Sequence, residues 1–332
     1  MNKTSLKWRI CIFVGIVLYF IYIHQRLHIR PDHIFLALLV LTLAFGKSGA
    51  RKFLVDWLPF ILFWVFYDMM RGVADNWRGA IHIKDIYDVE LALFGPLFGG
   101  KIPSFFFQDL QHAIDGSWFK KIFDLLAADL YTIHFAVPLL AGWVLWHTTN
   151  DRAMYYRFAY TMTILNIMAL TTFFLFPAAP PWYVMKYGFA QPQGELIGAA
   201  GSLISVDRLL KVNFFTTLWD NFNPNYFAAI PSLHGSYPIV VILFLYKKFR
   251  KYLPWLLLYP ILTWASAVYL NHHYIIDLVV GGMYLIIAYL IANKILFPFI
   301  FNKTIFRSGE TATFPEKVKK EEVVLADKQA TI

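Results

Sequence analysis

Two histidines and an aspartate near the carboxyl-terminal end of the chain have the spacing of a reactive pair. The stretch "YLNHHYIIDLVVGG" contains His272, His273 and Asp277 at the mouth of a long apolar segment. Because residues four apart share a helix face, His273 and Asp277 can touch, whereas His272 points elsewhere. A carboxylate that accepts a hydrogen bond from one imidazole nitrogen fixes the tautomer and leaves the other nitrogen free to attack an electrophile. The spacing therefore selects His273 as a nucleophile.

A third histidine can supply the proton that a leaving group needs. His234 lies in "AAIPSLHG", where Pro231 can occupy the first helical position and Ser232 follows within one turn. The unperturbed pKa of histidine, about 6.5, suits general acid and base catalysis. Together with His273 and Asp277, His234 predicts phosphoryl transfer that needs no metal and no other cofactor.

Both histidine clusters lie at the predicted starts of helices. Asn271 is a candidate cap for the helix that follows it. The free N–H groups and positive dipole end of two helix starts favour an anion, and they help to keep a histidine neutral. The pattern predicts a phosphate site between the two helix ends.

Other interpretations of the histidines stay open. A single histidine at the end of a membrane span is commonly an interfacial polar residue, which applies to His24, His28, His33 and His147. His134, deep in a predicted span, could be a hydrogen-bonding group of the bundle interior or a functional group. Two histidines and a carboxylate also match a ligand set of non-haem iron, although only one adjacent histidine pair occurs in this chain.

The composition indicates a polytopic membrane protein of the all-α class. Of the 332 residues 58% are hydrophobic and 15% are charged, and the mean hydropathy is +0.52. We expect a helical bundle of about eight spans, because a span needs about 20 apolar residues. The candidate spans are 8–24, 29–46, 53–70, 122–146, 157–177, 231–246, 254–270 and 275–299. They form one expected membrane-embedded domain, residues 1–307, before a solvated, disordered cytoplasmic tail, residues 308–332.

The distribution of basic residues predicts the orientation of these spans. The net charge of +9 is scattered over short loops, so we expect no nucleic-acid partner. With the N-terminus inside, the cytoplasmic loops hold Lys3, Lys7, Arg9, Lys47, Arg51, Lys52, Arg152, Arg157, Lys247, Lys248, Arg250 and Lys251. We therefore expect both termini in the cytoplasm and both histidine clusters at the extracytoplasmic surface.

The two long outer loops contain further structure. The segments "GAIHIKDIYDVELALFG" and "KIPSFFFQDLQHAIDGSWFKKIFDLL" place apolar and charged residues at helical spacing, which predicts amphipathic helices in the headgroup plane. In the later loop, "FPAAPPWYVMKYG" ends a span with two prolines and brings Trp182 and Tyr183 to the interface. An aromatic belt explains these rings as well as a substrate contact does.

The histidine motifs resemble those of the phosphatidic acid phosphatase type 2 superfamily, P-S-x-H and S-R-x-x-x-x-x-H-x-x-x-D. Within that superfamily, "AAIPSLHG", "WASAVYLNHHYIIDL" and "PPWY" are most similar to the branch of the inositol phosphorylceramide synthases. The resemblance implies a six-helix phosphatase-type core and a phosphohistidine formed on His273. It also implies that Asp277 orients the His273 ring, that His234 transfers protons, and that Ser232 with nearby amides holds phosphate oxygens.

The chain departs from the family pattern at one charged position. Counting back from His273, the motif serine is Ser266, but Ala267 stands where the motif has arginine. Another cation must then balance the phosphate charge. We expect Arg71 in "YDMMRG" to do so, unless it is a snorkelling interfacial residue. Weaker candidates for this charge are Lys186, Arg208 and Lys211.

The resemblance implies transfer of phosphoinositol from phosphatidylinositol to ceramide or a similar lipid alcohol, with diacylglycerol as the leaving lipid. The expected substrate contacts are Ser232, Arg71, Asn271, Tyr183 and Lys186. A lipid phosphatase would use the same catalytic residues, with water as the acceptor. A channel or transporter is a third class, disfavoured because the polar residues concentrate at one surface. We expect membrane lipids as partners, in a bacterial inner membrane or alternatively a Golgi membrane.

Overall fold

The computed structural model describes most of the chain between its first long helix and residue 299. The described residues are 6–26, 37, 40–41, 46–69, 79–148, 152–193, 196, 200–223 and 225–299. Most of the predicted span at 29–46, the candidate cation Arg71 and the predicted tail from 308 lie outside the described residues.

The described residues form an all-α protein, as expected, with isolated bridges as the only β pairing among them. Long helices occupy predicted spans: α1 (Leu6–Arg26), α3 (Gly46–Met69), α9 (Arg152–Leu175), α14 (Leu253–Tyr269) and α15 (Ile275–Leu290), which continues as the π-helix η5 (Ile291–Leu296). Two helices share one predicted span across the 3₁₀ turn η3 (Ile133–Phe135): α7 (Trp118–Thr132) and α8 (Ala136–Thr148). The predicted span at 231–246 corresponds to α13 (Leu233–Leu245).

Three helical segments of the described chain are long and apolar enough to cross a bilayer, namely Trp118–His147, Arg152–Leu175 and Ile275–Phe299. These segments identify an integral membrane protein. Helix α13 is apolar but has 13 residues, a length of about 20 Å against a hydrocarbon core of about 30 Å. The larger number of spans expected from the sequence stays a prediction.

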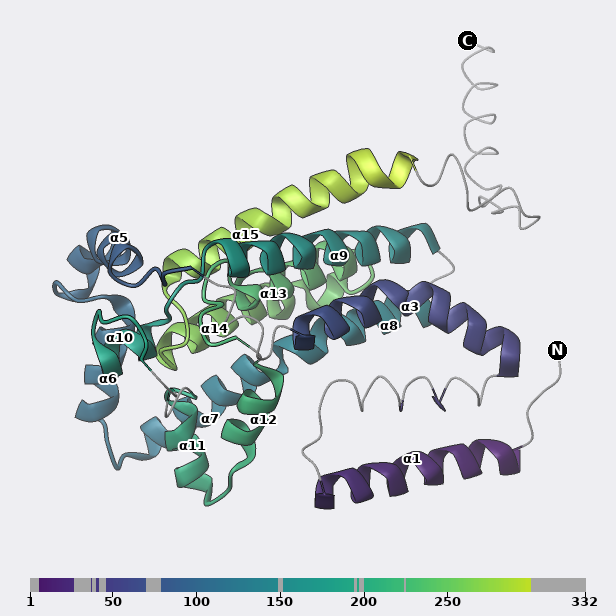
Figure 1. Cartoon of the computed structure of the whole chain (residues 1–332), viewed down its shortest axis with the longest axis horizontal. Coiled ribbons are helices and arrows are strands. Elements are labelled where there is room, and N and C mark those ends of the chain that lie inside the picture. Colours follow the sequence, from purple (N-terminus) through teal and green to yellow (C-terminus); the bar gives the residue numbers. More distant parts are fainter. Residues whose placement is uncertain are drawn as a thin grey trace, which may run out of the picture.

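The short helices gather toward one end of the bundle (Figure 1). They come from the two long loops: α5 (Lys84–Phe94), α6 (Pro103–Ala113), α10 (Pro181–Tyr187), α11 (Leu203–Leu210) and α12 (Phe214–Phe222). In the rest of the bundle α13 packs against α15, α14 and α8, and α9 packs against α15 and α3. The prediction of helices in the first long loop is confirmed, whereas their position in a headgroup plane stays a prediction.

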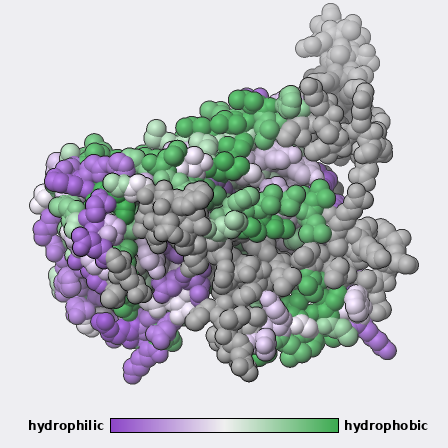
Figure 2. All heavy atoms as spheres, in the orientation of Figure 1, coloured by the Kyte–Doolittle hydropathy of each residue, from purple (hydrophilic) through white to green (hydrophobic). Residues whose placement is uncertain are grey.

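The surface polarity follows this arrangement. Figure 2 shows hydrophilic side chains over the end where the short helices gather and hydrophobic side chains along the long helices. Exposed apolar side chains on the long helices include Ile167, Leu175, Met283 and Ile286. Since soluble proteins rarely expose apolar surface of this extent, the long helices match a lipid environment and the short-helix end matches an aqueous boundary.

Two glycines allow α13 and α15 to cross with their backbones in contact. A Cβ atom on Gly235 of α13 would overlap the backbone of Leu278, and one on Gly281 of α15 would overlap the backbone of Ser232. At the same crossing the Ser232 N–H donates to the Asp277 carbonyl oxygen at 3.0 Å. The crossing therefore sets the separation of the two helix N-termini.

Substitution of Gly281 by alanine tests this close approach. Because the added methyl group has no space, Gly281→Ala should destabilise the folded protein by about 1–3 kcal/mol or more, seen as a lower melting temperature in detergent. The matched control is Gly282→Ala, whose Cβ would lie 3.7 Å from the Ile239 side chain, an ordinary contact. Equal melting temperatures for the two variants would show that the helices do not cross here as described.

Candidate active site

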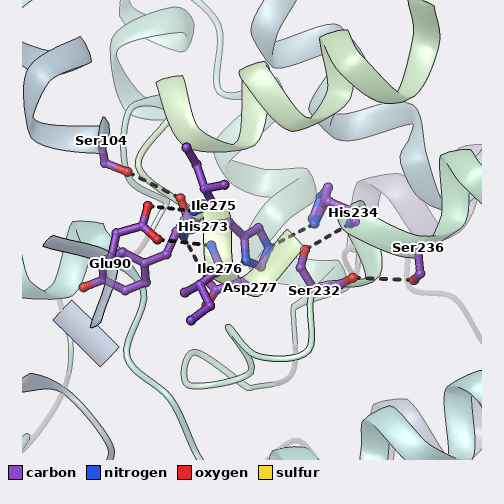
Figure 3. Close-up of polar contacts among 11 residues, drawn as sticks. Glu90, Ser104, Ser232, His234, Ser236, His273, Ile275, Ile276 and Asp277 are labelled. Carbon is purple, nitrogen blue, oxygen red and sulfur yellow. Dashed lines mark hydrogen bonds and ion pairs between the residues drawn. The ribbon is translucent and has the colours of Figure 1, made fainter. Parts of the chain in front are cut away.

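The first turns of two helices bring the predicted catalytic side chains together. His234 lies in the first turn of α13, Asp277 lies in the first turn of α15, and His273 lies just before α15. Nδ1 of His234 is 3.1 Å from Nε2 of His273, and Nδ1 of His273 is 3.3 Å from Oδ2 of Asp277 (Figure 3). All three side chains are buried. The structure thus places the predicted nucleophile between its predicted partners.

His273 meets Asp277 through helix capping rather than through a shared helix face. Helix α15 begins at Ile275 with Tyr274 as its N-cap, so His273 precedes the helix. The Asp277 side chain reaches back over the first turn, where Oδ2 also accepts the Tyr274 N–H at 2.9 Å. This bond is one half of a capping box. The predicted pair is therefore present, although the helical position assigned to His273 is wrong.

Asn271 turns the chain ahead of the histidine pair. It has a left-handed backbone with φ +64°, which asparagine tolerates better than most residues. Its carbonyl oxygen accepts the Trp182 N–H at 2.9 Å, and its side-chain amide donates to Ser202 Oγ at 3.0 Å. The prediction that Asn271 caps α15 is wrong, because Tyr274 holds that position and Asn271 links the loop to α10 and α11.

Ser232 begins α13. It is the N-cap residue, and its Oγ accepts the Gly235 N–H at 3.3 Å. The prediction that Pro231 holds the first helical position is wrong, because Leu233 holds it. Since the cap uses a lone pair of Ser232 Oγ, the hydroxyl proton is left to donate to another acceptor such as a phosphate oxygen.

Burial keeps His272 and His273 neutral. It lowers the pKa of His273 to about 3, against a smaller opposing effect of a hydrogen bond to the Ala229 backbone. It likewise lowers the pKa of His272 to about 3, although His272 Nε2 lies 3.1 Å from the Ala200 carbonyl oxygen. With Asp277 accepting from Nδ1–H of His273, the lone pair of Nε2 faces His234. His273 is therefore held in the protonation state of a nucleophile.

Backbone hydrogen bonds join the loop segments that surround these residues. The Ala178 N–H donates to the Phe227 carbonyl at 2.8 Å, and the Ala229 N–H donates to the Ala178 carbonyl at 3.4 Å. The segment that contains Ala178 also pairs with His82, whose carbonyl oxygen accepts the Ala179 N–H at 2.9 Å. These contacts anchor "FPAAPP" and "AAIPSLHG" to the loop that leads into α5.

A cavity of about 430 Å³ lies beside the predicted catalytic residues. Its lining contains four histidines: His134, His234, His272 and His273. Aromatic and aliphatic side chains form most of the rest, among them Tyr67, Tyr131, Phe135, Phe173, Trp182, Leu203, Phe215, Trp219, Tyr226 and Leu233. Lysine, arginine, aspartate and glutamate are absent from the described lining. An apolar cavity with a few convergent polar groups is typical of a small-molecule or lipid site.

The described part of the chain has no group of three histidine, cysteine, aspartate or glutamate side chains arranged to hold a metal ion. The iron-site interpretation therefore gains no support from the geometry of these residues.

Several predicted substrate contacts lie away from the cavity. Tyr183 is buried and its hydroxyl donates to the Ala190 carbonyl at 2.8 Å, whereas its neighbour Trp182 lines the cavity. Nζ of Lys186 lies 5.5 Å from the centre of the Tyr187 ring. Two further candidates, Arg208 and Lys211, line a separate cavity beside α11. The cation that balances a bound phosphate thus stays unassigned among the described residues.

Glu90 is a buried acid of the site that no local sequence motif indicates. Its carboxylate accepts the backbone N–H groups of Ile275 at 2.9 Å and Ile276 at 3.1 Å (Figure 3). Burial raises the pKa of Glu90 to about 7, against the lowering effect of these two hydrogen bonds. Glu90 therefore clamps the first turn of α15 from α5. The available signal was its position four residues after Ile86, on the buried face of an amphipathic helix.

Helix α6 supports the same loop from a second direction. Ser104 Oγ donates to the His273 carbonyl at 3.4 Å, and Gln111 Nε2 donates to the Tyr269 carbonyl at 2.7 Å. The helices of the first long loop thus position the segment that carries His273.

Substitution of Glu90 by glutamine should slow the reaction without removing a reacting group. Glutamine retains only one acceptor oxygen for the two N–H groups, and a displacement of the nucleophile by a fraction of an ångström should lower kcat about 10- to 100-fold. Since ionised Glu90 makes both bonds, wild-type kcat should rise as the pH passes about 7, and this rise should be absent in Glu90→Gln.

The control is Asp88→Asn, which neutralises an exposed carboxylate of the same helix. Equal rates and equal pH profiles for wild type and Glu90→Gln would contradict the clamp.

Comparisons with known proteins point to one family. Residues 108–291, which include both histidine motifs, match the family model described as PAP2 superfamily. The chain is 31% identical to the phosphoinositol dihydroceramide synthase of Bacteroides thetaiotaomicron, over 83% of this chain and 88% of that protein. No solved structure gives a significant match.

Fungal proteins are also similar to this chain. It is 27% identical to the inositol phosphorylceramide synthase of Candida albicans, over 82% of this chain and 54% of that protein. It is 26% identical to the inositol phosphorylceramide synthase catalytic subunit of Saccharomyces cerevisiae, over 96% of this chain and 76% of that protein. The family expected from the motifs is confirmed, and this chain belongs to the PAP2 superfamily.

Proposed function

We propose that this protein is a membrane phosphotransferase that moves phosphoinositol from phosphatidylinositol to ceramide or a similar lipid alcohol. The observation that carries the proposal is the neutral imidazole of His273, whose Nε2 faces His234 at the wall of an apolar cavity. The names of the bacterial and fungal relatives support the headgroup and the class of acceptor.

The first step forms a phosphohistidine. Nε2 of His273 attacks phosphorus, the bond from phosphorus to the diacylglycerol oxygen breaks, and His234, which is protonated in the complex with the anionic phosphodiester, gives its proton to that oxygen. Asp277 keeps its hydrogen bond to Nδ1 and stabilises the positive ring that forms. Because the two reactive nitrogens are 3.1 Å apart, the histidine rings have to separate to admit the phosphodiester.

The second step returns His273 to its free state. His234, now neutral, takes the proton of the acceptor hydroxyl while the hydroxyl oxygen attacks phosphorus, and the bond from phosphorus to Nε2 of His273 breaks. The products are the new phosphoinositol lipid and a protonated His234 ready for the next donor.

The phosphate charge is balanced by several weak contributors in this proposal. The N-terminus of α13 places a positive dipole end beside His234, and the Ser232 hydroxyl donates a hydrogen bond. Arg71 supplies the formal charge that Ala267 leaves missing from the family motif. This distribution is consistent with a lining that has no lysine or arginine among its described residues.

The site faces the extracytoplasmic side in the proposed topology, with both termini in the cytoplasm. The asymmetry of Lys and Arg between loops supports this orientation, and the hydrophilic short-helix end beside the catalytic residues agrees with an aqueous boundary. A bacterial inner membrane is the proposed location and a Golgi membrane the alternative.

Incubation of the purified protein with labelled phosphatidylinositol and ceramide tests the proposed function. Wild type should form a lipid that contains both inositol and ceramide, whereas His273→Ala and His234→Ala should lose at least about 10²-fold in rate. The control His147→Ala changes an exposed histidine of α8 and should keep full activity. Activity retained in either catalytic variant would contradict the triad, and release of inorganic phosphate from phosphatidic acid without a ceramide product would indicate a phosphatase.

The proposed role of Arg71 has its own test. Arg71→Ala should raise KM for phosphatidylinositol or lower kcat by about tenfold, because a charge-assisted hydrogen bond to phosphate contributes about 1.5–3 kcal/mol. Lys186→Ala serves as a comparison with a basic residue that does not line the cavity. If turnover and donor affinity of a folded Arg71→Ala protein equalled those of wild type, another group would carry the charge.

A further inference from the structure

His134 lines the cavity and has no part in the proposed phosphoryl transfer. It lies in η3, the 3₁₀ turn that separates α7 from α8 inside an otherwise apolar segment. Its side chain is 2% exposed. A buried polar ring at the break of an apolar helix is a candidate for a binding function.

The hydrogen bonds of His134 determine which of its nitrogens carries the proton. Nδ1 lies 2.6 Å from the backbone carbonyl oxygen of Tyr131. Because a carbonyl oxygen can only accept, Nδ1 carries the hydrogen and neutral His134 presents a lone pair at Nε2. Nε2 of His134 is buried and has no hydrogen-bond partner among the described residues. Buried polar atoms without a partner are rare, so a hydrogen-bond donor of a ligand would stabilise this lone pair.

The ring of His134 lies directly beside the catalytic acid. The ring centres of His134 and His234 are 3.4 Å apart, with the ring planes inclined by 33°. Any group that bonds Nε2 of His134 is therefore close to the reaction centre. Apolar side chains of Phe135, Leu139 and Phe173 line the same cavity.

A lone pair at Nε2 selects the chemistry of its ligand. It cannot bond a phosphate oxygen, which is itself an acceptor, and it requires an O–H or N–H donor. The reacting hydroxyl has only one hydrogen, which His234 removes in the proposed mechanism. A second hydroxyl of the substrate meets this requirement.

We propose that Nε2 of His134 accepts a hydrogen bond from a non-reacting hydroxyl of the bound acceptor lipid and so orients that lipid beside His234. The inference rests on the proposed function, because it assumes a lipid alcohol with two hydroxyls, as ceramide has. The apolar side chains around His134 favour the lipid acceptor over the inositol ring, although both carry hydroxyls. His134 is a binding residue that selects the acceptor in this account.

The test combines variants of His134 with acceptors that have or lack the second hydroxyl. His134→Phe keeps a planar ring without an acceptor, His134→Gln places an amide oxygen near the position of Nε2, and His147→Phe controls for an exposed histidine of the same segment. KM is measured separately for ceramide, for 3-deoxyceramide and for phosphatidylinositol.

Wild type should bind 3-deoxyceramide about tenfold more weakly than ceramide, as expected for one lost hydrogen bond. His134→Phe should show the same increase of about tenfold in KM with ceramide and no further increase with 3-deoxyceramide. Its KM for phosphatidylinositol should be unchanged. His134→Gln should restore part of the ceramide affinity.

Equal KM values of wild type for the two acceptors would overturn the proposal even if no variant folded. If His134→Phe changed only the KM for phosphatidylinositol, His134 would bind a hydroxyl of the inositol ring. That result would also overturn the proposal. Absence of any ceramide product with wild type would instead reject the proposed function, so the two failures are distinguishable.

Discussion

The site depends on the backbone contact between the first turns of α13 and α15. Gly235 and Gly281 let the two helices approach until the Ser232 N–H bonds the Asp277 carbonyl oxygen. That contact places His234 on one helix opposite the loop residue His273 that precedes the other helix. A helix pair whose backbones are in contact has little freedom to slide, which favours the positional precision that a nucleophile requires.

Burial and capping then give the residues their chemical roles. The low pKa of His273 follows from burial, and Asp277 directs the remaining lone pair by bonding the opposite nitrogen. Glu90 and α6 hold the backbone of the same loop from outside the bundle. The short helices of the first long loop are thus structural supports of the chemistry, although they contribute no reacting group.

Local sequence patterns predicted the helices and the pairing of His273 with Asp277, and they missed what long-range packing adds. The spacing of His273 and Asp277 suggested a contact across a shared helix face. The contact exists for another reason, because the Asp277 carboxylate reaches back over the first turn to residues that precede the helix. Glu90 was not identified because its partners lie 185 and 186 residues away. For His134 the sequence left two roles open, since its proximity to His234 arises only from the packing of η3 against α13.

The most direct test of the account is capture of the covalent intermediate on His273. Protein is mixed with phosphatidylinositol labelled at phosphorus, without an acceptor, quenched in alkali and digested for mass spectrometry. The proposed mechanism predicts a phosphoinositol group on the peptide that contains His273, labile to acid, absent from His273→Ala and removed by added ceramide. Label on a different residue, or ceramide product formed by His273→Ala at the wild-type rate, would contradict it.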